Sequence, residues 1–322
     1  MSGAPLLTVT DLTIEFPSSR PVNNLSFDIA EGETLAIVGE SGSGKSLTAL
    51  AIMGLLPRSA TISGGRIAFE GSDISKIGSR AMRTVRGKKI SMIFQEPMTS
   101  LNPVITVGYQ IVEALRQHQS MRRSQARARA IELLDLVRIP DPDKRVDSYP
   151  HELSGGMRQR VMIAIAVACE PRLLIADEPT TALDVTIQAQ ILDLLDSLRR
   201  QLSLSVLLIT HDLAVVAQWA NRVVVMYAGR KVEEASAEAF VTSPSHPYTR
   251  GLLSASPRSH PDLHYRNARL TEIPGNILSA SGEPGCGFRP RCDRARVSCA
   301  DRVPELQSIS RQHVVACPYF HD

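Results

Sequence analysis

Eight consecutive residues, three of them glycine, have the composition of a phosphate-binding loop. They read Gly39-Glu40-Ser41-Gly42-Ser43-Gly44-Lys45-Ser46. Glycines let the backbone wrap closely around an anion, with successive N–H groups pointing inward. In a loop of this pattern the lysine reaches the β- and γ-phosphates of a nucleotide, and the serine hydroxyl coordinates Mg²⁺. We therefore expect this stretch to bind a nucleoside triphosphate and its magnesium ion.

The residues on either side of this loop supply the expected structural context. The apolar run Thr34–Val38 precedes it, and a second run, Leu47–Met53, follows it. A buried strand, a tight turn and a buried helix distinguish a phosphate-binding loop from a chance glycine-rich turn. A helix that begins near Lys45 also adds its positive dipole end to the site.

Two adjacent carboxylates end another apolar segment. Leu173–Ala176 is followed directly by Asp177 and Glu178. Asp177 is placed to hold Mg²⁺ through water, as the acidic residue at this point does in P-loop enzymes. Glu178 can polarise an attacking water without being bound to the metal. The alternative is a pair of surface acids at a strand end, but the phosphate-binding loop upstream favours hydrolysis of the nucleotide by water.

Predicted strands and helices alternate along the chain. The predicted strands are Leu6–Phe16, Leu25–Ile29, Thr34–Val38, Arg66–Glu70, Lys89–Phe94, Arg172–Ala176, Ser205–Thr210, Val223–Tyr227 and Lys231–Glu234. The predicted helices are Val107–His118, Ser124–Arg138, Arg158–Cys169 and Val185–Gln201. Such alternation predicts an α/β fold whose mostly parallel sheet is covered on both faces.

The composition is that of a globular protein without a membrane span. Of 322 residues, 43% are hydrophobic and 21% are charged, and no apolar run approaches the roughly 20 residues that cross a bilayer. A net charge of +3 is too small to indicate a nucleic-acid partner. The start, Met1–Pro5, lacks the basic and apolar regions of a secretory signal. We therefore expect a cytosolic chain with reduced thiols.

The tripeptide Ser154-Gly155-Gly156, upstream of Asp177-Glu178, resembles the signature of the nucleotide-binding subunits of ABC transporters. The resemblance covers about residues 6–235. It implies an ATPase with a RecA-like P-loop core, a β-subdomain and a helical subdomain at about residues 98–168. We accordingly expect a nucleotide-binding domain at 1–235 that uses ATP and Mg²⁺.

The same resemblance implies roles for single residues. Gln95 corresponds to the glutamine that senses Mg²⁺ and the attacking water, and His211 to the switch histidine that contacts the γ-phosphate. Glu178, His211 and Gln95 are therefore the expected catalytic residues, and Ser46, Gln95 and Asp177 the expected magnesium residues. Asp184 belongs to the loop that crosses the dimer interface. Phe16 is a candidate to stack on adenine, although it could equally belong to the core of an edge strand.

In this family the signature Ser154-Gly155-Gly156 caps the γ-phosphate bound to the opposite subunit. Glycines allow the close approach, and a helix N-terminus faces the anion. Met157 departs from the common glutamine, which we interpret as a variation that spares the cap. The chain alone should therefore bind nucleotide and hydrolyse it poorly.

A second layer of resemblance concerns the cargo. Ser91–Pro103, Leu173–Gln190 and Ser245–Thr249 resemble the dipeptide and oligopeptide importer branch, in particular the first of its two ATPase subunits. Nickel, glutathione and antimicrobial-peptide systems share much of this pattern. A soluble ABC protein without a membrane partner is a further alternative, but it generally carries two cassettes or a long coiled coil. His246, beside two prolines, is interpreted as structural.

The importer resemblance also implies partners and a location. The expected partners are a second ABC ATPase subunit of different sequence, two transmembrane permease subunits, and a periplasmic or extracellular substrate-binding protein. The chain would sit peripherally on the cytoplasmic face of the bacterial inner membrane. Residues Met98–Ile111 are expected to contact the permease.

Four of the five cysteines lie near the C-terminus, at Cys286, Cys292, Cys299 and Cys317. Disulfides are disfavoured in a reducing compartment. Four thiolates satisfy a structural zinc ion, although zinc sites usually contain closer cysteine pairs. The wider spacings and the Cys317-Pro318 pair favour an iron–sulfur cube. The resemblance to peptide-importer ATPases also implies a [4Fe–4S] cluster here.

The C-terminal segment is short of apolar residues and a poor candidate for an unaided core. Five arginines in it could donate to sulfur: Arg289, Arg291, Arg294, Arg296 and Arg302. We expect the metal to fold a small Cys-rich domain at 263–322, joined to the ATPase domain by a linker at 236–262. A redox-regulated switch is the alternative role for this domain.

Overall fold

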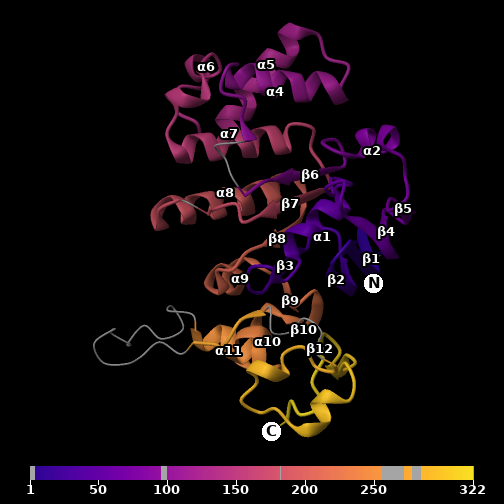
Figure 1. The fold of residues 1–322 in the computed structure, drawn as a ribbon. Coiled ribbons are helices and arrows are strands. Elements are labelled where there is room, and N and C mark those ends of the chain that lie inside the picture. Colours follow the sequence, from indigo (N-terminus) through magenta and orange to yellow (C-terminus); the bar gives the residue numbers. More distant parts are fainter. Residues whose placement is uncertain (1–3, 96–99, 182, 256–271, 278–283, 322) are drawn as a thin grey trace. The chain divides into compact units, whose positions relative to one another are not determined.

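The computed structural model describes residues 4–95, 100–181, 183–255, 272–277 and 284–321, shown as a coloured ribbon in Figure 1. The chain divides into two compact units. The first comprises Met1–Ala30, Thr34–Ser75 and Leu208–Asp322, and the second comprises Glu31–Glu33 and Lys76–Leu207.

A four-stranded antiparallel sheet in the first unit has the order β2-β1-β4-β5. Its strands are β1 (Leu7–Phe16), β2 (Ser19–Ile29), β4 (Thr61–Phe69) and β5 (Ser72–Asp73). The pairing of β1 with β2 shifts between Val9 and Leu12, where Asp11 has a φ of 48°. A bulge adds one residue to the strand, so the alternation of buried and exposed side chains shifts from odd-numbered to even-numbered positions. This explains why Leu7 and Val9 are buried before it, and Leu12 and Ile14 after it.

The second sheet of the first unit is mixed, with both parallel and antiparallel neighbouring strands. Its order is β11-β12-β10-β9-β3, with the end of β8 next to β3. Its strands are β3 (Thr34–Val38), β8 (Ser205–Ile209), β9 (Arg222–Tyr227), β10 (Arg230–Ser236), β11 (Gln307–Ser310) and β12 (His313–Val315). β3 and β9 are parallel, whereas β9 and β10 form the predicted antiparallel hairpin around Ala228 and Gly229.

The C-terminal segment shares the core of the first unit. The helices of this unit are α1 (Lys45–Ile52), α9 (Leu213–Trp219), α10 (Ala237–Thr242) and α11 (Pro247–Ala255), with 3₁₀ turns η4 (Arg289–Arg291) and η5 (Val297–Ala300). Phe288 is buried, with its ring centroid 5.2 Å from that of Tyr227 and 5.3 Å from that of Tyr248. β12 also pairs with β10. This segment is therefore held by aromatic packing and sheet pairing.

The second unit contains parallel strands β6 and β7, the start of β8, and most of the helices. Its elements are α2 (Ser79–Val85), β6 (Ile90–Ile93), α4 (Val107–His118), α5 (Arg123–Leu136), α6 (Pro142–Arg145), η1 (Pro150–Glu152), α7 (Gly155–Val167), β7 (Leu173–Asp177) and α8 (Val185–Leu202). α4, α5 and α7 pack on one another (Figure 1), and their apolar residues join one buried cluster with β6 and β7. Among the described residues, every helix is too short or too polar to cross a membrane.

Candidate functional site

The phosphate-binding loop joins β3 to α1 within the first unit. Gly39, Gly42 and Gly44 have φ angles of 150°, 82° and 99°. A Cβ atom on Gly39 would lie 2.2 Å from the carbonyl oxygen of Met226, and one on Gly44 would lie 2.4 Å from that of Pro21. Glycine is therefore required here because β9 and β2 pass so close to the loop.

Lys45 and Ser46 begin α1, as the sequence predicts. Lys45 is buried, and its Nζ donates to the carbonyl oxygens of Gly39 (2.7 Å) and Glu40 (2.9 Å). Gly44, before the helix, provides no side-chain cap. An anion can therefore accept hydrogen bonds from the N–H groups of the first turn, where the positive end of the helix dipole also attracts it. The loop fits the phosphates of a nucleotide.

His211 follows β8 in the first unit and is exposed. The N–H of Thr210, just before it, donates to the carbonyl oxygen of Ile37 in β3 (3.4 Å). His211 and the phosphate-binding loop therefore follow the ends of neighbouring strands. Asp212 caps α9 by accepting from the N–H groups of Ala214 and Val215.

Glu178 is the centre of a hydrogen-bonded group in the second unit. Its Oε2 accepts from Nε2 of Gln95 (3.0 Å) and from Oγ1 of Thr181 (2.9 Å). Glu178 has a φ of 47°, a left-handed conformation that is uncommon for residues other than glycine. Asp177, one residue earlier, is buried at the end of β7. The predicted acidic pair and glutamine thus lie together.

The signature residues begin α7 in the second unit. The Ser154 hydroxyl caps this helix by accepting from the N–H of Met157 (3.3 Å). A Cβ on Gly156 would lie 3.0 Å from Cγ2 of Ile187 in the first turn of α8, so a larger residue would require the Ile187 side chain to shift. Asp184 caps α8 with its Oδ1. The signature and the predicted dimer-interface loop are therefore neighbours.

Other predicted positions are placed individually. Phe16 is half-buried at the end of β1, where it pairs with Ser19. Of the segment expected to contact the permease, Met98 and Thr99 lie outside the described residues. Further along it, Val104 and Tyr109 are exposed, at 75% and 52%. The expected magnesium residues divide between the units, with Ser46 in the first and Gln95 and Asp177 in the second.

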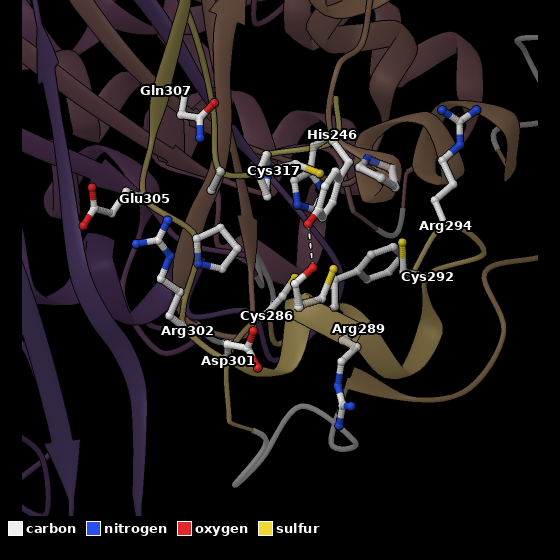
Figure 2. A pocket seen from close by; sticks show the side chains of 18 of the residues that line it. His246, Cys286, Arg289, Cys292, Arg294, Asp301, Arg302, Glu305, Gln307 and Cys317 are labelled. Carbon is white, nitrogen blue, oxygen red and sulfur yellow. Dashed lines mark hydrogen bonds between the residues drawn. The ribbon is translucent and has the colours of Figure 1, made fainter. Parts of the chain in front are cut away.

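The prediction of a metal cluster in the C-terminal segment is wrong. Cys286, Cys292, Cys299 and Cys317 all line one cavity of about 420 Å³ (Figure 2). Within the parts of the chain that the structure describes, however, no three His, Cys, Asp or Glu residues are grouped to bind a metal. Burial raises the pKa of Cys286 and Cys317, and raises that of Cys292 to about 11. The structure supports neither an iron–sulfur cluster nor zinc.

Two of the arginines expected to face sulfur have other partners. The guanidinium of Arg291 bonds to Glu40, and that of Arg296 lies 4.2 Å from the ring centroid of Tyr319. The cluster prediction relied on cysteine spacing and on the resemblance to peptide-importer ATPases, and neither reveals how the segment is packed. Aromatic packing around Phe288 and pairing of β12 supply the order that was attributed to a metal.

Two residues that contact the phosphate-binding loop have no assigned role there from the sequence. Tyr248 accepts a hydrogen bond from the Glu40 N–H, and Arg291 donates to the Glu40 carboxylate. Tyr248 lies in a stretch noted only for its resemblance to peptide importers, and Arg291 lies among other arginines. No motif or spacing joins either residue to the loop.

Comparison with known proteins identifies two matching families. The ABC transporter family matches residues 22–181, and the family described as the oligopeptide/dipeptide transporter C-terminal region matches residues 232–299. The dipeptide transport ATP-binding protein DppD of Bacillus subtilis (strain 168) is 51% identical over 319 residues, covering 97% of this chain and 94% of that protein. DppD of Escherichia coli (strain K12) is 47% identical, and the match covers 98% of this chain and 96% of that protein.

Solved structures match the cassette part. The dimeric ATP-binding cassette MJ0796, in a post-hydrolysis state bound to ADP and Pi, has a TM-score of 0.64 and 27% identity. The match covers 72% of this chain and 98% of the MJ0796 chain. CbiO1 from Clostridium perfringens, part of the ABC transporter complex cbiONQ, has a TM-score of 0.65 and 28% identity, with coverage of 74% and 92%. The phosphate-binding loop and these relatives together show that the chain belongs to the ATP-binding proteins of ABC transporters, in the oligopeptide/dipeptide transporter family.

Proposed function

We propose that this chain is an ATPase subunit of a peptide importer, in which hydrolysis of ATP powers the uptake of dipeptides or oligopeptides. One observation carries the proposal: the match to the DppD proteins extends through the C-terminal region as well as the ATPase motifs. MJ0796 and CbiO1, the two solved cassettes described above, match about three quarters of the chain, at 72% and 74%. The C-terminal region therefore favours peptides over other cargoes.

The loop at residues 39–46 would bind the phosphates of ATP, with Lys45 on the β- and γ-phosphates. Ser46, Gln95 and Asp177 would hold Mg²⁺, which neutralises charge on the phosphate oxygens. Phe16 is the candidate for stacking on adenine.

Glu178 would act as the general base. It accepts a proton from the attacking water as the water oxygen bonds to the γ-phosphorus and the bond to ADP breaks. Hydrogen bonds from Gln95 and Thr181 hold its carboxylate in one orientation. His211 would contact the γ-phosphate and stabilise the charge on its oxygens.

A complete site would need a second ATPase subunit. The N-terminus of α7, with Ser154, Gly155 and Gly156, would cap the γ-phosphate bound by the partner. Asp184 would lie at the dimer interface. The relative MJ0796 is dimeric with ADP and Pi bound, which supports a dimer of ATPase subunits here.

Transport would require further partners. We propose two permease subunits, a substrate-binding protein and a peripheral position on the cytoplasmic face of the membrane. The exposed side chains of Val104 and Tyr109 support a permease contact near the start of α4. Buried aromatic side chains such as tyrosine commonly contribute much of the binding energy of protein interfaces.

Glu178→Gln tests the ATPase mechanism. The amide keeps the size of the side chain but cannot accept a proton, so turnover should fall by about 10²- to 10⁴-fold. ATP should still bind, because Glu178 is not among the phosphate-binding residues. ATP binding and phosphate release by the assembled complex measure the two effects.

Asp193→Asn is the matched control, because this carboxylate is exposed on α8. It should hydrolyse ATP at the rate of the wild type. Normal turnover in Glu178→Gln would remove Glu178 as the base.

A further inference from the structure

Glu40, the second residue of the phosphate-binding loop, is held by two side chains from the C-terminal part of the first unit. Its backbone N–H donates to Oη of Tyr248 (2.8 Å). Its Oε2 accepts from Nη1 of Arg291 (2.8 Å). These partners lie 208 and 251 residues further along the chain. One loop residue is therefore fixed at both its main chain and its side chain.

The guanidinium of Arg291 is buried and immobilised. Its side chain is 4% exposed, and that of Glu40 is 27% exposed. Nε of Arg291 donates to the carbonyl oxygen of Pro274 (2.7 Å), and Nη2 donates to that of Ile273 (3.3 Å). Tyr227 Oη lies 3.4 Å from Nη1. A planar guanidinium that is held by these hydrogen bonds presents its charge to Glu40 in one orientation.

Tyr248 is fully buried in α11, where its ring packs against those of Tyr227 and Phe288. Burial, as the largest effect, raises the pKa of its hydroxyl. The hydroxyl therefore stays neutral, and its oxygen accepts the Glu40 N–H. The packing of α11 fixes the position of this acceptor.

Glu40 in turn connects these contacts to the catalytic part of the loop. Its carbonyl oxygen accepts from Nζ of Lys45 (2.9 Å) and from the N–H of Ser43 (3.2 Å). Ile277, close after the carbonyls that hold Arg291, lies about 4.0 Å from where a Cβ on Gly42 would be. The C-terminal segment thus contacts the loop at more than one residue.

A carboxylate in an anion-binding loop is electrostatically unfavourable, because it repels the phosphates that the loop binds. A buried arginine beside it offsets that repulsion, and removing the arginine leaves the charge uncompensated. The pair therefore has a function that packing alone does not explain.

We propose that the C-terminal region positions the phosphate-binding loop, with Arg291 neutralising and orienting Glu40 and Tyr248 fixing its main chain. Arg291 is a positioning residue that acts on the nucleotide through Glu40. The inference rests on the proposed function, since it assumes that this loop binds ATP. It explains why the C-terminal segment shares the core of the unit that carries the loop.

The test is calorimetric titration of the full-length chain with ATP. Arg291→Gln should weaken ATP binding by about tenfold, the effect of leaving one member of a buried charged pair without its partner. Adding Glu40→Gln to that variant should restore binding to within about threefold of the wild type, because contacting residues are coupled. Loss of overall packing would not be rescued in this way. Should Arg291→Gln fail to fold, Arg291→Met keeps the volume of the stem, and the same pair of results is expected.

Arg311→Gln is the matched control, since this arginine is exposed at the turn between β11 and β12, and it should bind ATP as the wild type does. Unchanged ATP binding in the Arg291 variant, or no rescue by Glu40→Gln, would overturn the inference. Lys45→Ala tests the underlying assumption separately. If Lys45→Ala binds ATP normally, the proposed nucleotide site itself is wrong.

Discussion

His246 illustrates at the scale of one residue how burial determines the role of a titratable side chain. It is 2% exposed, and its Nδ1 accepts the N–H of Tyr248 (3.1 Å). Burial, with a smaller contribution from Arg250, lowers its pKa to about 3. The imidazole is therefore neutral near neutral pH and cannot serve there as a general acid. Its hydrogen bond instead orders the start of α11, in agreement with the structural interpretation made from the sequence.

This shift makes the first unit sensitive to acid. The pKa of His246 is lower in the folded state than its ordinary value of 6.5, so its stabilising contribution is complete above pH 6.5 and is lost as pH falls toward 3. Between pH 7 and 5 this residue should account for about 2 kcal/mol of lost stability. His246→Asn supplies an acceptor that does not titrate and should remove that loss. Denaturant unfolding, followed by the fluorescence of Trp219 in α9, measures it. An equally steep pH dependence in the variant would contradict this account.

At the scale of elements, the carboxylate of Glu233 joins three parts of the first unit. Glu233 lies in β10 and is fully buried. Its oxygens accept from the N–H groups of Ser245 (2.8 Å) and His246 (2.9 Å), just before α11. His313 Nε2 in β12 lies 2.7 Å from Oε1. Since β10, α11 and β12 meet at this side chain, its loss should affect all three.

Glu233→Ala should therefore destabilise the first unit by about 3 kcal/mol, because it leaves buried donors without their acceptor. Glu233→Gln should cost less, since one oxygen is retained. The midpoint of denaturant unfolding, again followed at Trp219, measures both variants. Glu238→Ala in α10 is the control, because this glutamate is exposed and should change stability by less than about 0.5 kcal/mol. A Glu233→Ala variant as stable as this control would show that the carboxylate does not hold these elements.

The sequence was most informative where local patterns determine the structure. The strand Thr34–Val38 and the helix Val107–His118 occur with the predicted bounds. α7 begins at Gly155 and not at Arg158, because the Ser154 side chain caps it. Pro247 lies in the segment 236–262 that the sequence predicts to be a linker, but proline also suits the first position of a helix, and α11 begins there.

Contacts between distant residues could not be predicted in the same way. Gln95 and Glu178 lie 83 residues apart, and the resemblance to a family alone suggested that they act together. Arg291 and Glu40 lie 251 residues apart, and no motif suggested their contact. The four C-terminal cysteines show the opposite error, since a suggestive spacing accompanied side chains that form no metal-binding group among the described residues.

At the scale of the whole molecule, membership of the oligopeptide/dipeptide transporter family connects the ATPase motifs to transport. The C-terminal region packs into the core of the unit that contains the phosphate-binding loop. We therefore expect changes in this region to affect ATP use, and not only assembly with partners. Removing the region would expose the ring of Tyr227, which packs against Tyr248 and Phe288, so point substitutions are the better probes.

ATP hydrolysis by the complete importer in proteoliposomes tests the central claim most directly. The complex is supplied with its substrate-binding protein, either empty or loaded with a dipeptide, a nickel ion or glutathione. We predict that the dipeptide-loaded protein stimulates phosphate release and that labelled dipeptide accumulates in the lumen, with both effects lost in the Glu178→Gln variant of this chain. Stimulation by nickel or glutathione without a response to dipeptide, or dipeptide uptake that persists in Glu178→Gln, would contradict the account.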